Sequence, residues 1–316
     1  MALRLNGQGH EVRALVRATS VTQPLRDAGI PTFPGDIRDR ASMREGMSGA
    51  DWVIHAAAEL NLLSSDERMR GANVDGSENV ASLAWKLGVG RFLSISSVAI
   101  WGGSPADGSP ANEATAPQLP FPTRYSATKA AGEEIVQRYA RQGLKVNTVY
   151  PSLVYGPPGK KEGANALLRS LLLGRFPALV EPEKLASWVY LDDLVDGIAR
   201  VIEKAPPGRN FLFAGEAWTI RRLATRVAEA GGVRPPRLAL SAKAARRLFR
   251  VAAPLLRLAG KRLPVPLEQL DSLQRHWNFD DSRAQSELGW KKRPFEQGLV
   301  DTLAYIAAQK AAPAAR

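Results

Sequence analysis

The chain has 316 residues, of which 45% are hydrophobic, so it can bury one large core or one core and a smaller lobe. It contains no cysteine and only three histidines, which excludes disulfides and cysteine-ligated metals and gives no reason to expect a metal site. The formal charge of +12 comes from basic residues spread along the chain without a nucleic-acid-binding motif, so we expect no nucleic-acid partner.

Short apolar runs rich in β-forming residues alternate with helical patterns from residue 12 to about residue 215. The predicted strands are 12–16, 32–35, 52–56, 92–96, 146–150 and 211–214. The clearest predicted helices are 73–87, 125–141 and 192–203. The alternation predicts an α/β fold with a parallel sheet and crossover helices. After Gly215 the pattern changes to helical segments separated by proline and glycine, which predicts a smaller, mainly helical lobe.

Three residues in this pattern could carry acid–base chemistry. Ser97 follows a buried strand at its carboxyl end, where open α/β sheets bind ligands. Tyr125 and Lys129 are four positions apart, which places the phenol and the ammonium on one helix face. A nearby ammonium favours phenolate, so we expect a lowered pKa for Tyr125 and proton exchange with a substrate oxygen that Ser97 also binds. Alone, the Tyr–Lys spacing is equally compatible with an ordinary amphipathic helix.

Further motifs follow one another along the chain: Gly35-Asp36-Ile37-Arg38, His55 to Ala58, Asn73 to Gly76, Pro151 to Pro157, Trp188 to Asp193 and His276 to Asp280. With these motifs and with Ser97, Tyr125 and Lys129, in this order, the chain resembles nearly end to end the extended short-chain dehydrogenase/reductase family. The resemblance is to its epimerase/dehydratase, 3β-hydroxysteroid dehydrogenase and dihydroflavonol reductase group. It implies a Rossmann-type, doubly wound parallel sheet and an NAD(P)-dependent oxidoreductase.

The resemblance also implies individual roles. Ser97, Tyr125, Lys129 and Asn73 would be catalytic, and Lys129 would also bind the nicotinamide ribose. The other cofactor contacts would be Asp36 and Ile37 at the adenine, Ala56, Ala57 and Ala58 at the pyrophosphate and ribose, and Pro151, Ser152 and Val154 at the carboxamide. Each motif also has a structural alternative: Asp36 as a turn or cap residue, His55 as a hydrogen-bonded core histidine, Asn73 as an N-cap, and Pro151 as a strand terminator.

Arg17 bears on the choice of cofactor. It ends the strand where NAD-specific sites usually place an acidic side chain for the ribose hydroxyls. A guanidinium at that position suits a 2′-phosphate, so the sequence favours NADP(H) over NAD(H). A surface arginine with no cofactor role is the alternative.

The residues before the first predicted strand lack the usual start of a Rossmann domain. Gly7 and Gly9 precede a strand instead of following one, so they do not form the Gly-x-Gly-x-x-Gly turn that receives a pyrophosphate. We expect a sheet without its first strand, with unpaired backbone groups beside the gap. Either the sequence is truncated upstream, or the chain is a degenerate relative that holds the cofactor poorly.

We predict a dinucleotide-binding domain over 1–155, to which 192–215 returns, and a substrate-binding lobe over 156–191 and 216–316. Within the lobe, 241–262 is basic and helix-forming, with an apolar face formed by Leu248, Phe249, Ala252, Leu255 and Leu256. This helix could cover the substrate pocket, as most amphipathic helices face a core, or lie on an anionic membrane as a peripheral contact.

The favoured function is oxidation or reduction of a hydroxyl or ketone on a hydrophobic small molecule that is steroid-, isoprenoid- or polyketide-like. The alternatives are a nucleotide-sugar epimerase or dehydratase, and a non-catalytic NAD(P)-binding or scaffold protein. No apolar run reaches the roughly 20 residues that span a bilayer, and no secretory signal is present, so we expect a cytoplasmic protein. A homodimer is left open.

Overall fold

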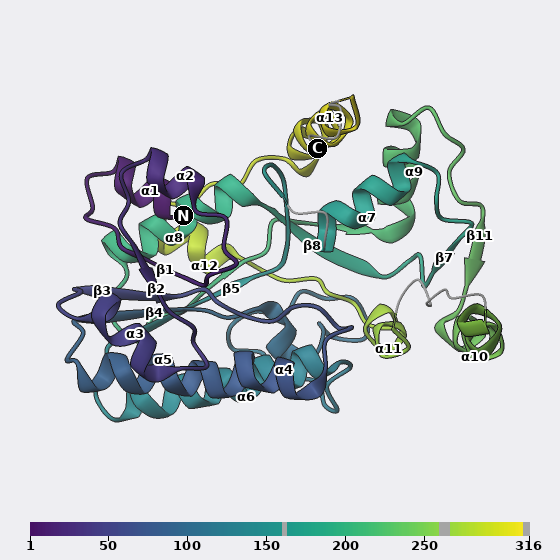
Figure 1. The fold of residues 1–316 in the computed structure, drawn as a ribbon. Coiled ribbons are helices and arrows are strands. Elements are labelled where there is room, and N and C mark those ends of the chain that lie inside the picture. Colours follow the sequence, from purple (N-terminus) through teal and green to yellow (C-terminus); the bar gives the residue numbers. More distant parts are fainter. Residues whose placement is uncertain (160–162, 259–265, 312–316) are drawn as a thin grey trace.

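The computed structural model describes residues 1–159, 163–258 and 266–311, and Figure 1 shows an α/β part beside a smaller lobe. The α/β part contains a four-stranded parallel sheet in the order β3 (Trp52–His55), β4 (Arg91–Ile95), β5 (Val146–Pro151) and β9 (Phe211–Phe213). Two further parallel strands, β1 (Ala14–Val16) and β2 (Thr32–Pro34), pair only with each other. The predicted α/β fold and all six predicted strands are therefore confirmed, with small shifts of their ends.

Helices cover both faces of the four-stranded sheet (Figure 1). On one face α3 (Arg40–Met47), α5 (Gly76–Lys86) and α6 (Arg124–Arg141) enclose a core that includes Phe92. On the other, α8 (Leu191–Lys204) and α12 (Ser282–Leu288) enclose a core that includes Leu93. Neighbouring residues of a strand point to opposite faces, so Phe92 and Leu93 fill different cores. The sheet is doubly wound, as predicted.

The sheet is interrupted between β1 and β3. In the described ranges no strand pairs with both of them, so the two sheets lie side by side without a shared ladder (Figure 1). Helix α3 packs against β1, β2 and α5 and thereby connects the two sheets on one face. The short α1 (Ala2–Gly7) packs against α8, and α2 (Gln23–Asp27) joins β1 to β2. This arrangement agrees with the expected sheet without its first strand.

The helix predicted to begin at residue 73 begins earlier. It starts as α4 (Asp66–Arg70), capped by the Ser65 hydroxyl, which accepts a 3.2 Å hydrogen bond from the Arg68 N–H. A five-residue π-helical turn over Gly71–Asp75 then leads into α5. The predicted start was wrong because Gly71 and Gly76 are typical of helix ends. Such π-turns often occur at functional sites.

The lobe is mainly helical, and its sheets include, among the described residues, five short strands that the sequence did not reveal, one of which, at 153–155, lies inside the range predicted for the dinucleotide-binding domain. Strands β6 (Leu153–Tyr155), β8 (Leu185–Tyr190) and β10 (Glu216–Thr219) form one sheet in the order β10-β8-β6. Strand β7 (Ala178–Val180) pairs with β11 (Leu238–Leu240). The lobe helices are α7 (Gly163–Leu172), α9 (Ile220–Ala230), α10 (Ala242–Leu258), α11 (Gln269–Leu273) and α13 (Phe295–Ala311).

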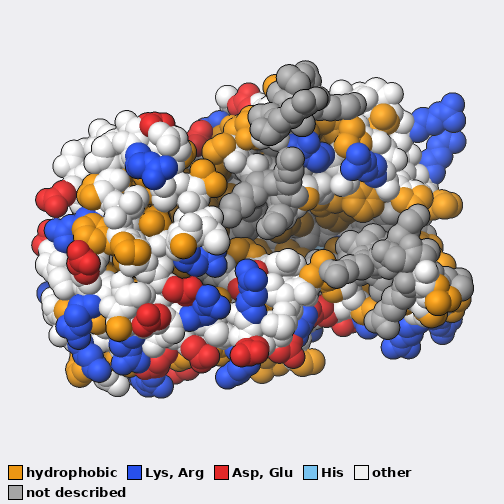
Figure 2. Space-filling view, viewed as in Figure 1, with side chains coloured by type: hydrophobic (Ala, Val, Ile, Leu, Met, Phe, Trp, Pro, Cys, Tyr) orange, Lys and Arg blue, Asp and Glu red, His pale blue; other side chains and the backbone are white. Residues whose placement is uncertain are grey.

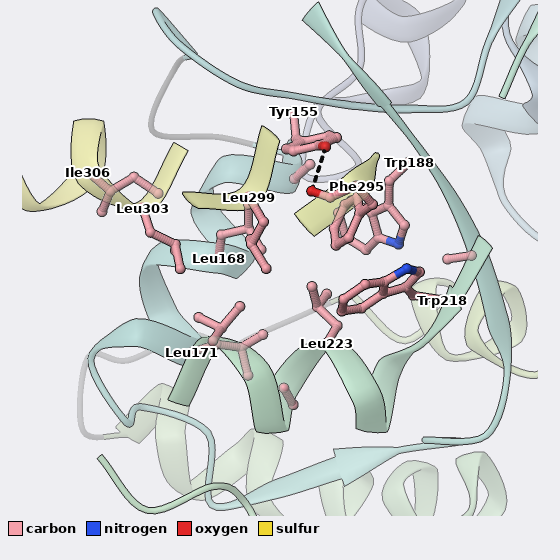
Figure 3. Packing of buried hydrophobic residues seen from close by; sticks show 14 of the residues in the cluster. Tyr155, Leu168, Leu171, Trp188, Trp218, Leu223, Phe295, Leu299, Leu303 and Ile306 are labelled. Carbon is pink, nitrogen blue, oxygen red and sulfur yellow. Dashed lines mark hydrogen bonds between the residues drawn. The ribbon is translucent and has the colours of Figure 1, made fainter. Parts of the chain in front are cut away.

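Aromatic side chains fill the core of the lobe (Figure 3). Phe295, at the start of α13, packs against Tyr155, Trp188 and Trp218, with ring centroids 4.6–5.7 Å apart. The Tyr155 hydroxyl donates a 3.2 Å hydrogen bond to the Phe295 carbonyl. These contacts attach the C-terminal helix to the β10-β8-β6 sheet, so the lobe has its own core.

The predicted amphipathic helix is present as α10. It buries Ala242 and Ala245 against Leu270 of α11, whereas Leu248, Val251 and Leu258 are 56%, 69% and 86% exposed. The side chains of Leu255 and Leu256, and residues 259–262 of the predicted segment, lie outside the described residues. No helix in the described part of the chain is long and apolar enough to cross a membrane.

Candidate active site

The predicted site residues follow the carboxyl ends of successive parallel strands. Arg17 follows β1, Asp36 follows β2, the Ala56–Ala58 segment follows β3, and Ser97 follows β4. Pro151 ends β5. Because carboxyl ends of parallel strands share one edge of a sheet, Ala56–Ala58, Ser97 and Pro151 lie along one edge of the four-stranded sheet, where open α/β sheets bind ligands. Arg17 and Asp36 follow the carboxyl ends of the separate β1–β2 pair.

Ser97 and Tyr125 are brought together at this edge. Ser97 caps the short 3₁₀ helix η2 (Val98–Trp101) by accepting a 3.1 Å hydrogen bond from the Ala99 N–H. Tyr125 is the second residue of α6, whose N-cap Thr123 accepts a hydrogen bond from the Ser126 N–H. Helix α6 packs against η2, which brings the Ser97 and Tyr125 side chains close to one another. One substrate oxygen could therefore meet both hydroxyls.

The expected low pKa of Tyr125 is wrong. Burial raises the pKa of the phenol above its ordinary value, and the neighbouring Ser97 hydroxyl only partly offsets this effect. The reason is that the Lys129 ammonium donates its hydrogen bond to the Ile95 carbonyl, 3.1 Å away, and not to the phenol. Tyr125 is therefore protonated at neutral pH and is prepared to donate a proton.

Lys129 is a buried cation. Its side chain is only 9% exposed, and burial lowers the pKa of its ammonium from 10.5 to about 8, although the negative charge of Glu133 opposes this shift. The ammonium also lies near His55, whose pKa falls to about 3 through burial and the charge of Lys129. His55 is thus neutral, and its Nε2 is 3.2 Å from the Ser77 hydroxyl. This contact matches the alternative interpretation of His55 as a hydrogen-bonded core histidine.

Asn73 connects helix α6 to the segment after β3. Its side chain accepts a 2.8 Å hydrogen bond from the Glu59 N–H and donates to the Glu59 carbonyl and the Thr128 hydroxyl, 3.0 and 3.1 Å away. Asn73 is 2% exposed and lies inside the π-turn, so it is not an N-cap. Gly132 lets α6 approach this turn, because a Cβ there would stand 2.2 Å from the Asn73 carbonyl oxygen.

A hollow of about 520 Å³ lies at the carboxyl ends of β1 and β2 and is lined by Arg17, Asp36, Ser42 and neighbouring residues. Arg38 donates hydrogen bonds to Asp36 at 2.9 and 3.0 Å and, together with the charge of Arg17, lowers the Asp36 pKa to about 2. These hydrogen bonds match the alternative interpretation of Asp36 as a turn residue. Ile37 packs toward Gly76 and the core under α5, away from this hollow.

The remaining predicted cofactor residues follow β3 and β5, the two neighbours of β4 in the sheet. Ala56 and Ala57, after β3, are exposed and Ala58 is partly so. On the β5 side, Pro151 is buried, the Ser152 hydroxyl donates a 2.6 Å hydrogen bond to the Ala214 carbonyl, and Val154 is 36% exposed on β6. The two groups therefore flank Ser97, which follows β4.

Sequence reasoning missed the residues that hold the site together. Glu59 and Thr128 fix Asn73 from positions 14 and 55 residues away, and Ile95 receives the Lys129 ammonium from 34 residues away. Only its position next to Lys129 in the sequence could have indicated that Thr128 belongs to the site. No spacing pattern could have marked Glu59, because it contacts Asn73 through its own backbone N–H and carbonyl.

Comparison with known proteins supplies the family. The model described as "NAD dependent epimerase/dehydratase family" matches residues 1–214. The chain is 28% identical to 4-hydroxy-2-methyl-3-oxo-4-farnesyl-3,4-dihydroquinoline-1-oxide ketoreductase of Stigmatella aurantiaca, over 95% of this chain and 90% of that protein. It is 27% identical to sterol demethylase protein B of Methylococcus capsulatus, over 96% and 92%. The crystal structure of gox2253 superposes with a TM-score of 0.83 and 29% identity, over 98% and 94%.

Proposed function

The chain belongs to the NAD-dependent epimerase/dehydratase family, and on that basis we propose that it reduces a ketone on a hydrophobic small molecule, or oxidises the corresponding alcohol, with NAD(P)(H). The observation that carries the proposal is the convergence of Ser97, Tyr125, Lys129 and Asn73 at the carboxyl edge of the sheet. We propose these four as the catalytic set.

The protonation states favour ketone reduction at neutral pH. Bound NAD(P)H supplies the hydride. The Tyr125 phenol, kept protonated by its raised pKa, donates a proton to the substrate oxygen, and the Ser97 hydroxyl donates a second hydrogen bond to the same oxygen. The Lys129 ammonium, which donates to the Ile95 carbonyl, would bind the nicotinamide ribose. Asn73 holds α6, and therefore Tyr125 and Lys129, against the segment after β3.

The residues present fit such a cofactor at two ends. The hollow at Arg17 and Asp36 suits the adenosine, and Lys129 suits the nicotinamide ribose. Between them the small side chains of Ala56, Ala57 and Ala58, with Pro151, Ser152 and Val154 beyond, leave space for the phosphates and the carboxamide. Among the described residues, the phosphate region has no glycine-rich turn between a strand and a helix.

We propose NADP(H) as the preferred cofactor, because Arg17 lines the adenosine hollow. Arg17→Ala should weaken NADPH binding about tenfold or more and leave NADH binding within about twofold, since only NADPH has a phosphate for the guanidinium. The measurement is cofactor fluorescence titration. Arg13→Ala is the matched control, because Arg13 precedes the same strand and donates to the Ser48 carbonyl. Equal loss for both cofactors would contradict the assignment.

The two relatives support an apolar substrate, since their names specify a farnesyl-bearing ring ketone and a sterol. We propose that residues 1–155 with 192–215 bind the dinucleotide and that 156–191 with 216–316 bind the substrate. One C-terminal element crosses this division, because α12 and Trp290 pack against α8 and β9 of the Rossmann part.

A substrate series tests the proposed function. Loss of NADPH absorbance should accompany incubation with a 3-ketosteroid, a farnesyl-bearing ketone or a 2-alkyl-3-oxoalkanoate. Change of a dTDP- or UDP-sugar instead would favour the epimerase or dehydratase alternative. Failure of both NADPH and NADH to bind would support a scaffold protein.

We also propose that the outer face of α10 contacts anionic membranes. Exposed Leu248 and Val251 lie beside exposed Arg247 and Arg250, and the helix contains no acidic residue. In Figure 2, apolar and basic side chains adjoin at the end of the lobe where Figure 1 places α10. Elsewhere on the face in Figure 2, basic and acidic groups are interspersed, unlike the continuous basic surface of a nucleic-acid-binding protein.

Vesicle sedimentation tests the membrane contact. The protein should sediment with phosphatidylserine-containing vesicles and not with phosphatidylcholine alone, and Leu248→Glu with Val251→Glu should abolish this binding. Arg221→Glu on α9, an exposed arginine paired with Glu183, is the control and should bind normally. Binding that survives the α10 changes would overturn the assignment.

A further inference from the structure

Arg124, the residue immediately before Tyr125, joins three separate parts of the chain. Its guanidinium donates to the Leu62 and Ser64 carbonyls at 2.7 and 3.4 Å and pairs with Asp66 at the start of α4. It also donates to Glu268 of the lobe through Nε and Nη2, at 3.1 and 2.9 Å. The first turn of the catalytic helix is therefore bonded both to the segment after β3 and to the lobe.

Glu268 is fixed by Arg124 at the start of α6 and by the packing of α11 within the lobe. Its carboxylate accepts a third hydrogen bond, 2.9 Å long, from the Arg124 backbone N–H, where a negative charge stabilises the start of α6. On the lobe side, α11 begins at the next residue, and its Leu270 is fully buried against Ala242 and Ala245 of α10. A movement of the lobe would therefore act directly on the residue next to Tyr125.

The same lobe segment has a second attachment to the Rossmann part. Arg275, beyond α11, donates to the carbonyls of Gly102, Gln118 and Pro120 at 2.7, 2.9 and 2.6 Å. Gly102 caps the helix η2 that begins after Ser97. Residues 268–275 thus contact the start of α6 through Glu268 and the end of the helix that Ser97 begins through Arg275.

We propose that the Arg124–Glu268 pair is a positioning device that fixes the substrate lobe relative to Tyr125. The pair is charged, bidentate and partly shielded, with side chains 40% and 20% exposed, so it resists displacement better than an open surface pair. The proposal deepens the function proposed above. The effect of the pair on catalysis rests on the proposed function. Its effect on the position of the lobe does not depend on that function.

A distance measurement tests the lobe geometry without turnover. The chain has no cysteine, so Lys86→Cys on α5 and Lys243→Cys on α10, both exposed, can carry spin labels at unique sites. In the labelled full chain, a double electron–electron resonance experiment should give one narrow distance distribution. Glu268→Gln and Arg124→Gln should each widen it about twofold or more, and the double variant should widen it no further.

Asp271→Asn is the matched control. Asp271 lies on α11 and pairs with Arg246 inside the lobe, so its loss should leave the distance distribution narrow. A narrow distribution in both Glu268→Gln and Arg124→Gln, or equal widening in Asp271→Asn, would overturn the proposal.

A kinetic measurement addresses the consequence for catalysis. With a ketone accepted in the substrate series, Glu268→Gln should raise KM about tenfold, with smaller changes in kcat and in NADPH affinity. An unchanged KM despite a widened distance distribution would refute the catalytic consequence alone. Absence of any accepted ketone would count against the proposed function and leave the distance result standing.

Discussion

Tyr125→Phe should lower kcat for ketone reduction about a thousandfold while NADPH affinity stays within about twofold, because only the proton donor is removed. The phenol is protonated at neutral pH through burial, and a phenylalanine ring fills the same space without an acidic hydrogen. Steady-state kinetics and fluorescence titration of the same preparation measure the two quantities.

Tyr139→Phe makes the same change on the same helix and serves as the control. The Tyr139 hydroxyl bonds Glu78 near the far end of α6, away from the carboxyl edge of the sheet. This variant should retain wild-type kcat. A Tyr125→Phe enzyme with wild-type turnover, or a Tyr139→Phe enzyme equally impaired, would refute the assigned proton donor.

Lys129→Met should strongly reduce turnover and make the protein more stable at neutral pH. The folded-state pKa of about 8, against 10.5 for the exposed group, corresponds to about 3 kcal/mol of destabilisation from burying the charge. Loss of the hydrogen bond to Ile95 offsets about 1 kcal/mol of the gain. The net effect is a gain of about 2 kcal/mol at pH 7, with turnover reduced about a hundredfold or more.

The pH dependence of the unfolding free energy distinguishes the cost of burying the Lys129 charge from a general change in packing. Below pH 8 Lys129 is charged in both the folded and the unfolded chain, so the full penalty is present. Between pH 8 and 10.5 only the unfolded chain keeps the proton, so wild-type stability rises and the advantage of Lys129→Met shrinks by about 2 kcal/mol. Urea unfolding of both proteins at pH 7 and pH 10 measures this change. A difference in unfolding free energy that is equal at both pH values would contradict the account.

The sequence predicted the Rossmann part well because its signals are local. Buried strands such as 92–96 are continuous apolar runs between helices, and the carboxyl-end rule then predicts Ser97 at the ligand-binding edge of the sheet. The gap between β1 and β3 also followed from the sequence, since the residues before β1 lack a strand and turn.

The remainder depends on contacts between distant segments. The three-residue strands β7 and β11 are too short for a periodic signal and form because residues 178–180 and 238–240 meet in the lobe. The direction of the Tyr125 pKa shift was wrong for a similar reason, because helix spacing placed Lys129 nearby but could not show that its ammonium bonds Ile95. The proposed catalytic roles of the site residues remain predictions.

A crystal structure of the protein grown with NADPH tests the central claim most directly. The account predicts the nicotinamide ring beside the Ser97 and Tyr125 hydroxyls, its ribose at the Lys129 ammonium, and the adenosine 2′-phosphate at Arg17. A nicotinamide held away from both hydroxyls, or no bound cofactor at saturating NADPH, would contradict it.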